Sequence, residues 1–221
     1  MLERYDRMLG ALTETELKFI REKTVFIAGC GGLGGYLLEY LARLGVGKIR
    51  VADGDVFEAS NLNRQLLSAP ELIGTKKVRA AASRGKLINP DVSIEAVPEH
   101  LSAKNAAQLL ADCDLALDAL DNSASRRILS DSCSASGIPL VHGAIQGWVA
   151  QAAVSLPGDM LMDKLYPSDG SESKASLPFT PALCAAMQAS LCTQLLAGRA
   201  VETGRVWYFD LLNMELENYH I

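Results

Sequence analysis

The sequence predicts an α/β fold of the Rossmann-like kind, with a mostly parallel sheet, helices on both faces and added antiparallel strands in the C-terminal part. Between residues 24 and 143, apolar runs of strand length alternate with helical patterns, as in parallel sheets whose crossovers are helices. After residue 143 this alternation stops, and strand-like segments follow one another directly. The chain has 221 residues, 49% of them hydrophobic, which is enough to bury a sizeable core.

The elements are expected in a regular order. Thr13-x-x-Glu16 is a capping box, which predicts a short helix within an N-terminal helical arm over residues 1–23. The alternating part is predicted to contain strands over 24–29, 48–52, 92–97, 115–119 and 139–143, separated by helices over 33–44, 75–87, 103–111 and 123–136.

The C-terminal part, residues 144–221, follows a different pattern. We predict a hairpin over 146–156, a helix over 181–196, and strands near 206–211 and 214–217. Residues 157–181 are rich in Gly, Ser, Asp and Pro, and a connection of that length is typical of a lid, a crossing loop or a disordered segment. Because no repeat and no second core pattern occurs, we expect a single domain over 1–221.

Composition and charge argue against several classes of protein. The net charge is -5, from 21 Lys and Arg against 26 Asp and Glu, which disfavours nucleic-acid binding through phosphate contacts. The longest uncharged stretch, 175–198, is interrupted by prolines and polar residues, so we expect a buried helix there rather than a membrane span. The N-terminus lacks the apolar run of a secretory signal, which predicts a cytoplasmic protein.

A glycine-rich segment joins the first strand to the first long helix. It reads Gly29-Cys30-Gly31-Gly32-Leu33-Gly34 and fits G-x-G-x-x-G at the start of a helix, where backbone N–H groups and the helix dipole stabilise phosphate. Asp53 follows about 20 residues later, at a strand end from which a carboxylate binds ribose hydroxyls. A nucleotide is therefore the first ligand to consider. The alternative is that these glycines merely allow a tight turn and close helix packing.

The residues after Asp53 suit nicotinamide chemistry poorly. Asp53-Gly54-Asp55 is soon followed by Ser60-Asn61-Leu62-Asn63-Arg64-Gln65, which gathers acids, amides and a cation just after the strand end. Hydride transfer needs no such cluster, whereas phosphoryl chemistry requires cations and a metal ion that meet the charge on phosphate oxygens. A solvated polar loop is the simpler alternative for this cluster. A nicotinamide-dependent dehydrogenase is a further option on the glycine motif alone.

Together with Lys77-Val78 and Asp118-Ala119-Leu120-Asp121-Asn122, these motifs resemble the ThiF/MoeB/HesA adenylyltransferases, relatives of the ubiquitin-activating enzymes. The resemblance covers about residues 4–210. It implies an enzyme that uses Mg-ATP to adenylate the C-terminal Gly-Gly carboxylate of a ubiquitin-like sulfur carrier, ThiS-like or MoaD-like, and releases pyrophosphate. Such activation supplies sulfur for thiamin or for a molybdenum or tungsten cofactor. Residues 24–143 would then bind the nucleotide, and residues 144–221 the carrier.

The resemblance also implies roles for individual residues. Arg64 and Lys77 match the family's triphosphate-binding cations, which are needed because a carboxylate must attack the α-phosphorus of a polyanion. An ordinary exposed lysine is the alternative for Lys77. The full set of ATP-binding residues that the resemblance implies is Gly29, Gly31, Gly32, Gly34, Asp53, Asp55, Asn61, Arg64, Gln65, Lys77, Asp121 and Asn122.

Asp121 lies at the carboxyl end of a predicted parallel strand, where ligands of open α/β sheets gather. By resemblance it coordinates Mg²⁺, and one carboxylate with phosphate oxygens is sufficient for that ion. Asp118 is expected to be structural, and Asn122 to cap the helix that follows. A surface aspartate in a turn is the alternative for Asp121.

The segment Arg4-Tyr5-Asp6-Arg7 resembles the family's N-terminal Arg-Tyr-x-Arg, whose second arginine reaches the ATP of the neighbouring subunit. The resemblance therefore implies a homodimer in which Arg7 acts in trans, as a catalytic residue beside Arg64, Lys77 and Asp121. A planar, permanently charged guanidinium suits phosphate geometry. A solvated arginine is the alternative.

The chain departs from many of these relatives in its cysteines. The cysteines of this chain form no Cys-x-x-Cys pair, so we predict neither a structural zinc site nor a disulfide framework. The crossing loop 157–181 contains no cysteine that could form a thioester or a persulfide. Cys184 is a candidate reactive thiol only if a helix N-terminus activates it, and a packed thiol is the simpler interpretation. The five cysteines are Cys30, Cys113, Cys133, Cys184 and Cys192.

Two further residues and two alternative functions complete the interpretation of the sequence. His142 is expected to be a hydrogen-bonded core histidine, and Trp148 either covers the hairpin or lines a channel for the carrier's tail. One alternative function is adenylation of a small molecule or a tRNA nucleoside, although the acidic charge argues against tRNA. The other is a non-catalytic subunit that binds nucleotide or carrier, which the missing zinc cysteines permit and the phosphate-binding cations oppose.

Overall fold

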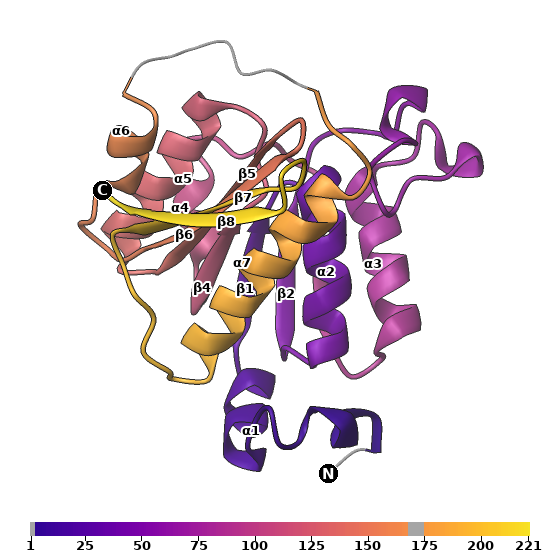
Figure 1. Ribbon diagram of the computed structural model, residues 1–221. Helices are drawn as coiled ribbons and strands as arrows, with labels where there is room; N and C mark the ends of the chain where they lie inside the picture. The colour runs from indigo at the N-terminus through magenta and orange to yellow at the C-terminus, as the bar shows by residue number, and fades with distance from the viewer. Residues whose placement is uncertain (1–2, 168–174) are drawn as a thin grey trace.

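A computed structural model describes residues 3–167 and 175–221 of the chain (Figure 1). One eight-stranded sheet crosses the molecule, with its first five strands parallel and its last three added antiparallel, as predicted. Its spatial order is β3 (Ser93–Val97), β2 (Lys48–Ala52), β1 (Thr24–Ala28), β4 (Leu115–Asp118), β5 (Leu140–Gln146), β6 (Val149–Ser155), β7 (Arg205–Asp210) and β8 (Glu215–His220).

Helices cover both faces of this sheet, because the strands of its parallel part are joined by helical crossovers (Figure 1). One face carries α2 (Gly32–Leu44), α3 (Lys77–Ile88) and α7 (Thr180–Leu196). The other face carries α4 (Ala106–Leu110), α5 (Ser123–Ser136) and α6 (Leu161–Leu165). Two short 3-10 turns, η2 (Ala59–Asn61) and η3 (Pro70–Leu72), lie between β2 and α3.

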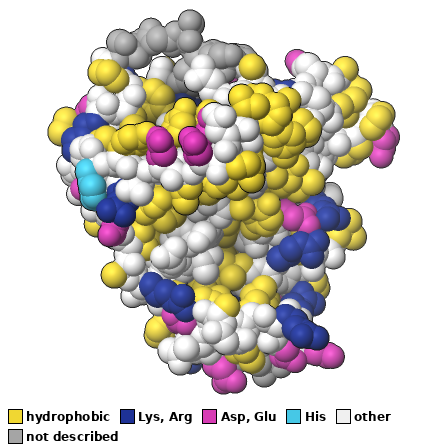
Figure 2. Space-filling model, in the orientation of Figure 1, with side chains coloured by type: hydrophobic (Ala, Val, Ile, Leu, Met, Phe, Trp, Pro, Cys, Tyr) yellow, Lys and Arg dark blue, Asp and Glu magenta, His cyan; other side chains and the backbone are white. Residues whose placement is uncertain are grey.

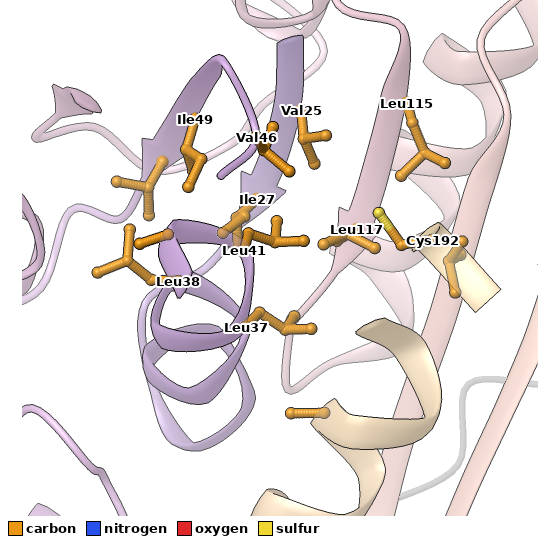
Figure 3. Packing of buried hydrophobic residues seen from close by; sticks show 14 of the residues in the cluster. Val25, Ile27, Leu37, Leu38, Leu41, Val46, Ile49, Leu115, Leu117 and Cys192 are labelled. Carbon is orange, nitrogen blue, oxygen red and sulfur yellow. The ribbon is translucent and has the colours of Figure 1, made fainter. Parts of the chain in front are cut away.

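The main core lies between the sheet and the α2–α7 layer (Figure 3). Alternate residues of a strand point to opposite faces, so Ile27 and Leu117 join this core while Phe26 packs against α4 and α5 on the other side. Leu41 of α2 is fully buried in the main core, which stabilises the fold by about 2 kcal/mol relative to an exposed side chain. The uncharged helix predicted in the C-terminal part is α7, and its Cys192 belongs to the same cluster.

The N-terminal arm lies at the amino ends of the parallel strands (Figure 1). It consists of the 3-10 helix η1 (Glu3–Met8) and α1 (Glu14–Arg21), and the predicted capping box of Thr13 and Glu16 is present at the start of α1. Glu16 also pairs with Arg199, at 2.6 Å from Nε to Oε1, just beyond the end of α7. The arm is therefore anchored to the core at the end of the sheet where the parallel strands begin.

Several boundaries differ from the predicted ones for local reasons. The last parallel strand continues to Gln146 and turns back directly into β6, so β5 itself forms one arm of the hairpin expected over 146–156. Gly147 permits this turn because its φ of +57° is in the left-handed region. The helix expected over 103–111 is shorter: residues 103–105 form a turn, within which Asn105 Oδ1 accepts from the Ser102 backbone N–H at 2.8 Å, and α4 begins at Ala106.

The C-terminal part holds further differences. Helix α6 forms within the crossing loop expected over 157–181, of which residues 168–174 lie outside the described residues. The last strand, β8, extends to His220, three residues beyond the predicted end at Glu217. Over the described ranges 3–167 and 175–221, the helices are all too short or too polar to span a bilayer.

Candidate active site

A cavity opens at the carboxyl ends of the parallel strands, where open α/β sheets bind ligands. The strand ends are level with one another, since Ala28 pairs with Ala52 on one side and with Asp118 on the other. The loops that leave β1, β2 and β4 therefore meet at one place. Of the predicted residues, the lining includes Gly29, Gly31, Gly32, Asp53, Asp55, Arg64, Gln65, Lys77, Asp121 and Asn122.

The glycine loop brings the start of α2 against the end of β1. Gly29 has a φ of +98°, and a Cβ at this position would lie 2.6 Å from the Ala119 carbonyl oxygen. A Cβ at Gly34 would lie 2.1 Å from the Gly29 oxygen, so this glycine is required for the close approach and does not line the cavity. Gly31 is the N-cap of α2 and has no side chain to cover the first helical N–H groups. These groups are available to an anion in the cavity.

Asp53 connects the end of β2 to the glycine loop. Its carboxylate is 9% exposed and accepts hydrogen bonds from the backbone N–H of Cys30 at 2.7 Å and of Asp55 at 2.8 Å. An ionised carboxylate has about four acceptor positions, so Asp53 keeps acceptor capacity for a ligand hydroxyl. The residue expected to bind ribose thus also holds the glycine loop in shape.

Lys77 is a buried cation in the cavity wall, only 6% exposed, so the alternative of an ordinary exposed lysine is wrong. Its Nζ lies 2.9 Å from Asp55 Oδ2 and 3.9 Å from Asp53 Oδ2. Burial alone would raise the pKa of Asp55, but the hydrogen bond and the charge of Lys77 hold that pKa below its ordinary value. His100 also lines the cavity, and its Nε2 lies 3.5 Å from Asp55 Oδ1. The sequence did not indicate this residue as part of the site, because it follows β3 and belongs to none of the motifs.

The polar loop after β2 supplies Arg64 and Gln65 to the cavity. Arg64 Nη1 donates to the Ser60 carbonyl oxygen at 2.8 Å, which holds its guanidinium over the loop. Gln65 is 7% exposed, and its Oε1 has no hydrogen-bond partner among the described residues. Asn61 instead accepts from the Glu58 backbone N–H at 3.1 Å, inside η2, and is not part of the lining.

These features fit a nucleoside triphosphate. The uncovered start of α2 and the cations Arg64 and Lys77 suit phosphate oxygens, which are anionic acceptors. An unpaired buried acceptor costs about 1–3 kcal/mol, so Gln65 Oε1 favours a ligand that brings an O–H or N–H donor. Ribose and a nucleobase carry such donors, whereas the phosphates supply the negative charge.

Asp121 and Asn122 lie in the turn between β4 and α5. Asn122 Oδ1 accepts from the Ser125 backbone N–H at 2.9 Å and caps α5, as predicted. Its Nδ2 donates to Asp121 Oδ1 at 3.3 Å. The described residues contain no group of three or more His, Cys, Asp or Glu side chains suited to a metal ion. A magnesium ion here would therefore be held by Asp121 together with oxygen atoms of the ligand.

Asp118 and His142 form a buried pair behind this turn. Both side chains are fully buried, and His142 Nδ1 lies 2.7 Å from Asp118 Oδ2. His142 is thus a hydrogen-bonded core histidine, as predicted, and Asp118 is buried beside it. Arg126, on α5, joins them at 3.5 Å from Nε to Asp118 Oδ2 and also lines the cavity. Sequence patterns gave no sign of Arg126, because its role arises from contacts across three elements.

The cysteines offer no activated thiol at the cavity. Cys184 is fully buried, and burial raises the pKa of its thiol to about 12, so its candidacy as a reactive thiol is not supported. Its Sγ lies 3.3 Å from the Gln151 carbonyl oxygen inside the core. Burial raises the pKa of the other four thiols as well. In the part of the chain that the structure describes, all five cysteines lie outside the cavity lining.

Besides Gly34 and Asn61, two further predicted residues lie away from the cavity lining. Arg7 is exposed on η1, at the opposite end of the parallel strands, so the N-terminal arm does not carry it to the cavity of its own chain (Figure 1). Trp148 is 42% exposed at the turn between β5 and β6, and its ring centroid lies 5.4 Å from that of Phe179. Figure 2 shows hydrophobic side chains gathered on this face, over the start of α7.

The fold and the cavity define a Rossmann-like α/β protein whose glycine loop is suited to phosphate groups. More closely, the chain belongs to the ThiF family, whose model matches residues 5–221, and the resemblance to the ThiF/MoeB/HesA proteins is thereby confirmed.

Two curated relatives illustrate this membership. The SAMP-activating enzyme E1 of Haloferax volcanii is 36% identical over 202 residues, which cover 87% of this chain and 74% of that protein. The sulfur carrier protein adenylyltransferase of Thermus thermophilus is 38% identical over 165 residues, which cover 72% of this chain and 61% of that protein. The chain thus spans less than two thirds of the second relative.

Solved structures share the fold at lower identity. PaaA matches with a TM-score of 0.84 and 20% identity, over 99% of this chain and 73% of that chain. E. coli MccB, crystallised with AMPCPP and MccA, matches with a TM-score of 0.86 and 16% identity, over 98% of this chain and 71% of that chain. These matches confirm the predicted architecture, including the antiparallel strands at the end of the chain.

Proposed function

We propose that this chain is an ATP-dependent adenylyltransferase that activates the C-terminal Gly-Gly carboxylate of a ubiquitin-like sulfur-carrier protein. The observation that carries the proposal is the joint presence, in one cavity, of the open N-terminus of α2, the cations Arg64 and Lys77, and Asp121. Membership of the ThiF family supports it, as do the names of the relatives, a SAMP-activating enzyme and a sulfur carrier protein adenylyltransferase.

The chemistry assigns a task to each group. A carrier carboxylate oxygen attacks the α-phosphorus, the new P–O bond forms, and the bond to the β-phosphate oxygen breaks so that pyrophosphate leaves with the electron pair. Arg64 and Lys77 lower the repulsion between the two anions and stabilise the departing pyrophosphate. Asp53 binds the ribose, and Asp121 would hold Mg²⁺, which neutralises charge on the phosphates when bound.

The carrier's tail is proposed to enter from the C-terminal half, residues 144–221. Ile145 of β5 lines the cavity, and the nearby turn exposes Trp148 beside Phe179. Such apolar walls suit a tail without side chains, which a Gly-Gly end provides. A ThiS-like or MoaD-like carrier fits this requirement, and the pathway would be thiamin or molybdenum/tungsten cofactor biosynthesis, in the cytoplasm.

The reaction on this chain is proposed to end at the acyl-adenylate. A later thioester or persulfide would need an accessible thiolate, and burial raises the pKa of every cysteine of the chain. The sulfur donor would therefore come from another protein. No structural zinc is proposed, because the chain has no Cys-x-x-Cys pair.

The active unit is proposed to be a homodimer. Arg7 is exposed and distant from its own cavity, so it can act only in the cavity of a second copy. An Arg7→Ala variant mixed with Asp121→Asn would then recover part of the activity that each lacks alone, because mixed dimers hold one intact site. Equal inactivity of the mixture and the separate variants would contradict the trans arrangement.

ATP–pyrophosphate exchange tests the main proposal. We expect exchange only with Mg²⁺ and a Gly-Gly-ended carrier, and a loss of about a hundredfold or more in Asp121→Asn. Asp91→Asn, an exposed aspartate before β3, is the matched control and should exchange normally. Removal of the carrier's last glycine should abolish exchange. Mg-ATP binding without exchange with any such carrier would refute carrier adenylation and favour a small-molecule substrate or a non-catalytic subunit.

A further inference from the structure

A series of hydrogen-bonded polar groups, buried at Asp118 and His142 and half-buried at Gln151 and Tyr166, lies behind the cavity wall and reaches from β4 to the end of α6. Its centre is Asp118, the last residue of β4, which is fully buried. Asp118 Oδ1 accepts a hydrogen bond from the Leu120 backbone N–H at 2.9 Å. Leu120 directly precedes Asp121, so this carboxylate helps to set the path of the turn that carries the candidate magnesium ligand.

The other carboxylate oxygen of Asp118 meets His142, 24 residues further along the chain. An ionised carboxylate only accepts, so His142 Nδ1 is the donor at 2.7 Å, and in the neutral ring Nε2 is left as an acceptor. Nε2 faces the Tyr166 hydroxyl at 3.1 Å, and Gln151 Nε2 donates to the same hydroxyl at 3.0 Å. Each donor therefore faces an acceptor along this series of hydrogen bonds, from Gln151 through Tyr166 and His142 to Asp118.

Arg126 braces the same turn from α5. Its Nη2 donates to the Leu120 carbonyl oxygen at 2.9 Å, while its Nε lies 3.5 Å from Asp118 Oδ2. Its guanidinium also lies over the Tyr166 ring, 5.1 Å from the centroid. Both backbone polar groups of Leu120 are thus held by side chains of one network, which consists of Asp118, Arg126, His142, Gln151 and Tyr166.

Stability alone explains this network poorly. Removing a carboxylate from water costs several kcal/mol, and well-packed apolar residues often give equal or greater stability at such a position. Neither Asp118 nor His142 lines the cavity, so neither contacts a ligand directly. What the network does achieve is a fixed position for the backbone on either side of Leu120, at the edge of the cavity.

We propose that Asp118 and His142 are positioning residues that hold the turn of Asp121 in the arrangement needed for the magnesium-bound nucleotide. The proposal rests on the proposed function, because it assigns Asp121 to the metal. His142 orients the Asp118 carboxylate through their hydrogen bond, Asp118 and Arg126 hold Leu120, and Leu120 sets the position of Asp121. Groups that orient a metal ligand in this indirect way typically change metal affinity or activity by about 10–100-fold when they are removed.

The test compares two substitutions of one residue by calorimetry. His142→Leu removes the donor to Asp118, whereas the Nδ2 of His142→Asn can take the place of the ring Nδ1 and still donate. Binding of Mg-ATP and of ATP in EDTA is measured for each variant and for the wild type. We expect His142→Leu to weaken Mg-ATP binding about tenfold or more, with the affinity for ATP in EDTA unchanged. The ratio of these two affinities is the magnesium preference. We expect His142→Asn to keep most of the preference of the wild type.

The outcomes separate this proposal from the proposed function. A wild type without a magnesium preference, or one whose preference survives in Asp121→Asn, would overturn the assignment of Asp121 and with it the proposed function. If the wild type behaves as expected but His142→Leu keeps the full preference, only the positioning proposal fails. Equal weakening of both forms of ATP, or a lower melting temperature alone, would also overturn it in favour of a merely structural role.

A second variant covers the case in which His142→Leu does not fold. Arg126→Lys keeps a positive charge beside the cavity. A lysine ammonium lacks the planar fork of the guanidinium, so it cannot donate to the Leu120 carbonyl oxygen and lie beside Asp118 at the same time. A selective loss of Mg-ATP affinity in this variant supports the proposal. Unchanged affinities for both forms of ATP would overturn it.

Discussion

Replacing Gly34 by alanine tests how closely α2 must approach the end of β1. A Cβ at this position would lie 2.1 Å from the Gly29 carbonyl oxygen, well inside the 3.4 Å at which ordinary van der Waals contact begins. Gly32 offers a matched control in the same loop, because its Cβ would lie 3.6 Å from Pro181 Cγ, in ordinary contact. Neither glycine has a φ in the left-handed region, so the two substitutions differ in space rather than in backbone strain.

The magnitudes follow from these contacts. The atom that a Gly34 methyl meets belongs to the backbone and cannot rotate away, so the cost lies near the upper end of the roughly 1–3 kcal/mol of overpacking. The higher helix propensity of alanine returns up to about 1 kcal/mol. We therefore expect Gly34→Ala to lower the free energy of unfolding by about 2 kcal/mol. Gly32→Ala should leave it within about 1 kcal/mol of the wild type.

The two variants should also differ in how they lose nucleotide affinity. Gly32 lines the cavity, so its methyl group would meet the phosphates on a loop of unchanged stability. Urea denaturation and ATP titration, measured on the same preparations, separate the two effects. A Gly34→Ala protein as stable as the wild type would refute the close approach of α2 to β1. A Gly32→Ala protein that binds ATP normally would refute the placement of the phosphates over the glycine loop.

Three further predictions concern single side chains. Asp53→Asn should lower the free energy of unfolding by about 1.5–3 kcal/mol in urea, because an amide cannot replace both charge-assisted hydrogen bonds to backbone N–H groups, and an unchanged midpoint would contradict this role. The hydrogen bond from Arg199 is the main cause that lowers the pKa of Glu16 from 4.5 to about 2. The ionised Glu16 carboxylate therefore contributes fully to stability above pH 4.5, and this contribution is lost as the pH falls toward 2. Calorimetry should find Glu16→Gln less heat-stable than the wild type at pH 7 and equal to it near pH 2. Cys184→Ala should retain pyrophosphate exchange and carrier adenylation, and loss of exchange in a folded variant would restore that thiol as a catalytic candidate.

Local patterns predicted the parts of the fold and of the site that neighbouring residues build. The glycine loop, the cap at Asn122 and the capping box of Thr13 and Glu16 each depend on residues a few positions apart, and all three have the expected geometry. The parallel strands were predictable because burial on both faces leaves continuous apolar runs in the sequence. The last strand, in contrast, was predicted to end at Glu217, three residues too early. The residues of β8 are all exposed, so its polar residues carry no burial signal.

Contacts between distant elements could not be predicted from such patterns. His100 enters the cavity only because β3 lies beside β2, and Arg126 only because α5 turns back over Asp118. The burial of Lys77 also depends on distant residues, since its ammonium group pairs in the cavity wall with the carboxylates of Asp53 and Asp55, which follow β2. In each case the residue type is common on protein surfaces, so sequence alone favours a solvated side chain.

The strand order explains how separate motifs form one cavity. The order β3-β2-β1-β4-β5 places the loops after β2 and β4 on either side of the glycine loop, although 65 residues separate Asp53 from Asp118 along the chain. The cations for the phosphates come from the β2 side, and Asp121 comes from the β4 side. A triphosphate over the glycine loop would therefore lie between them. The network behind Asp121 extends this arrangement to β5, since His142 can reach Asp118 only because β5 is the next strand in the sheet.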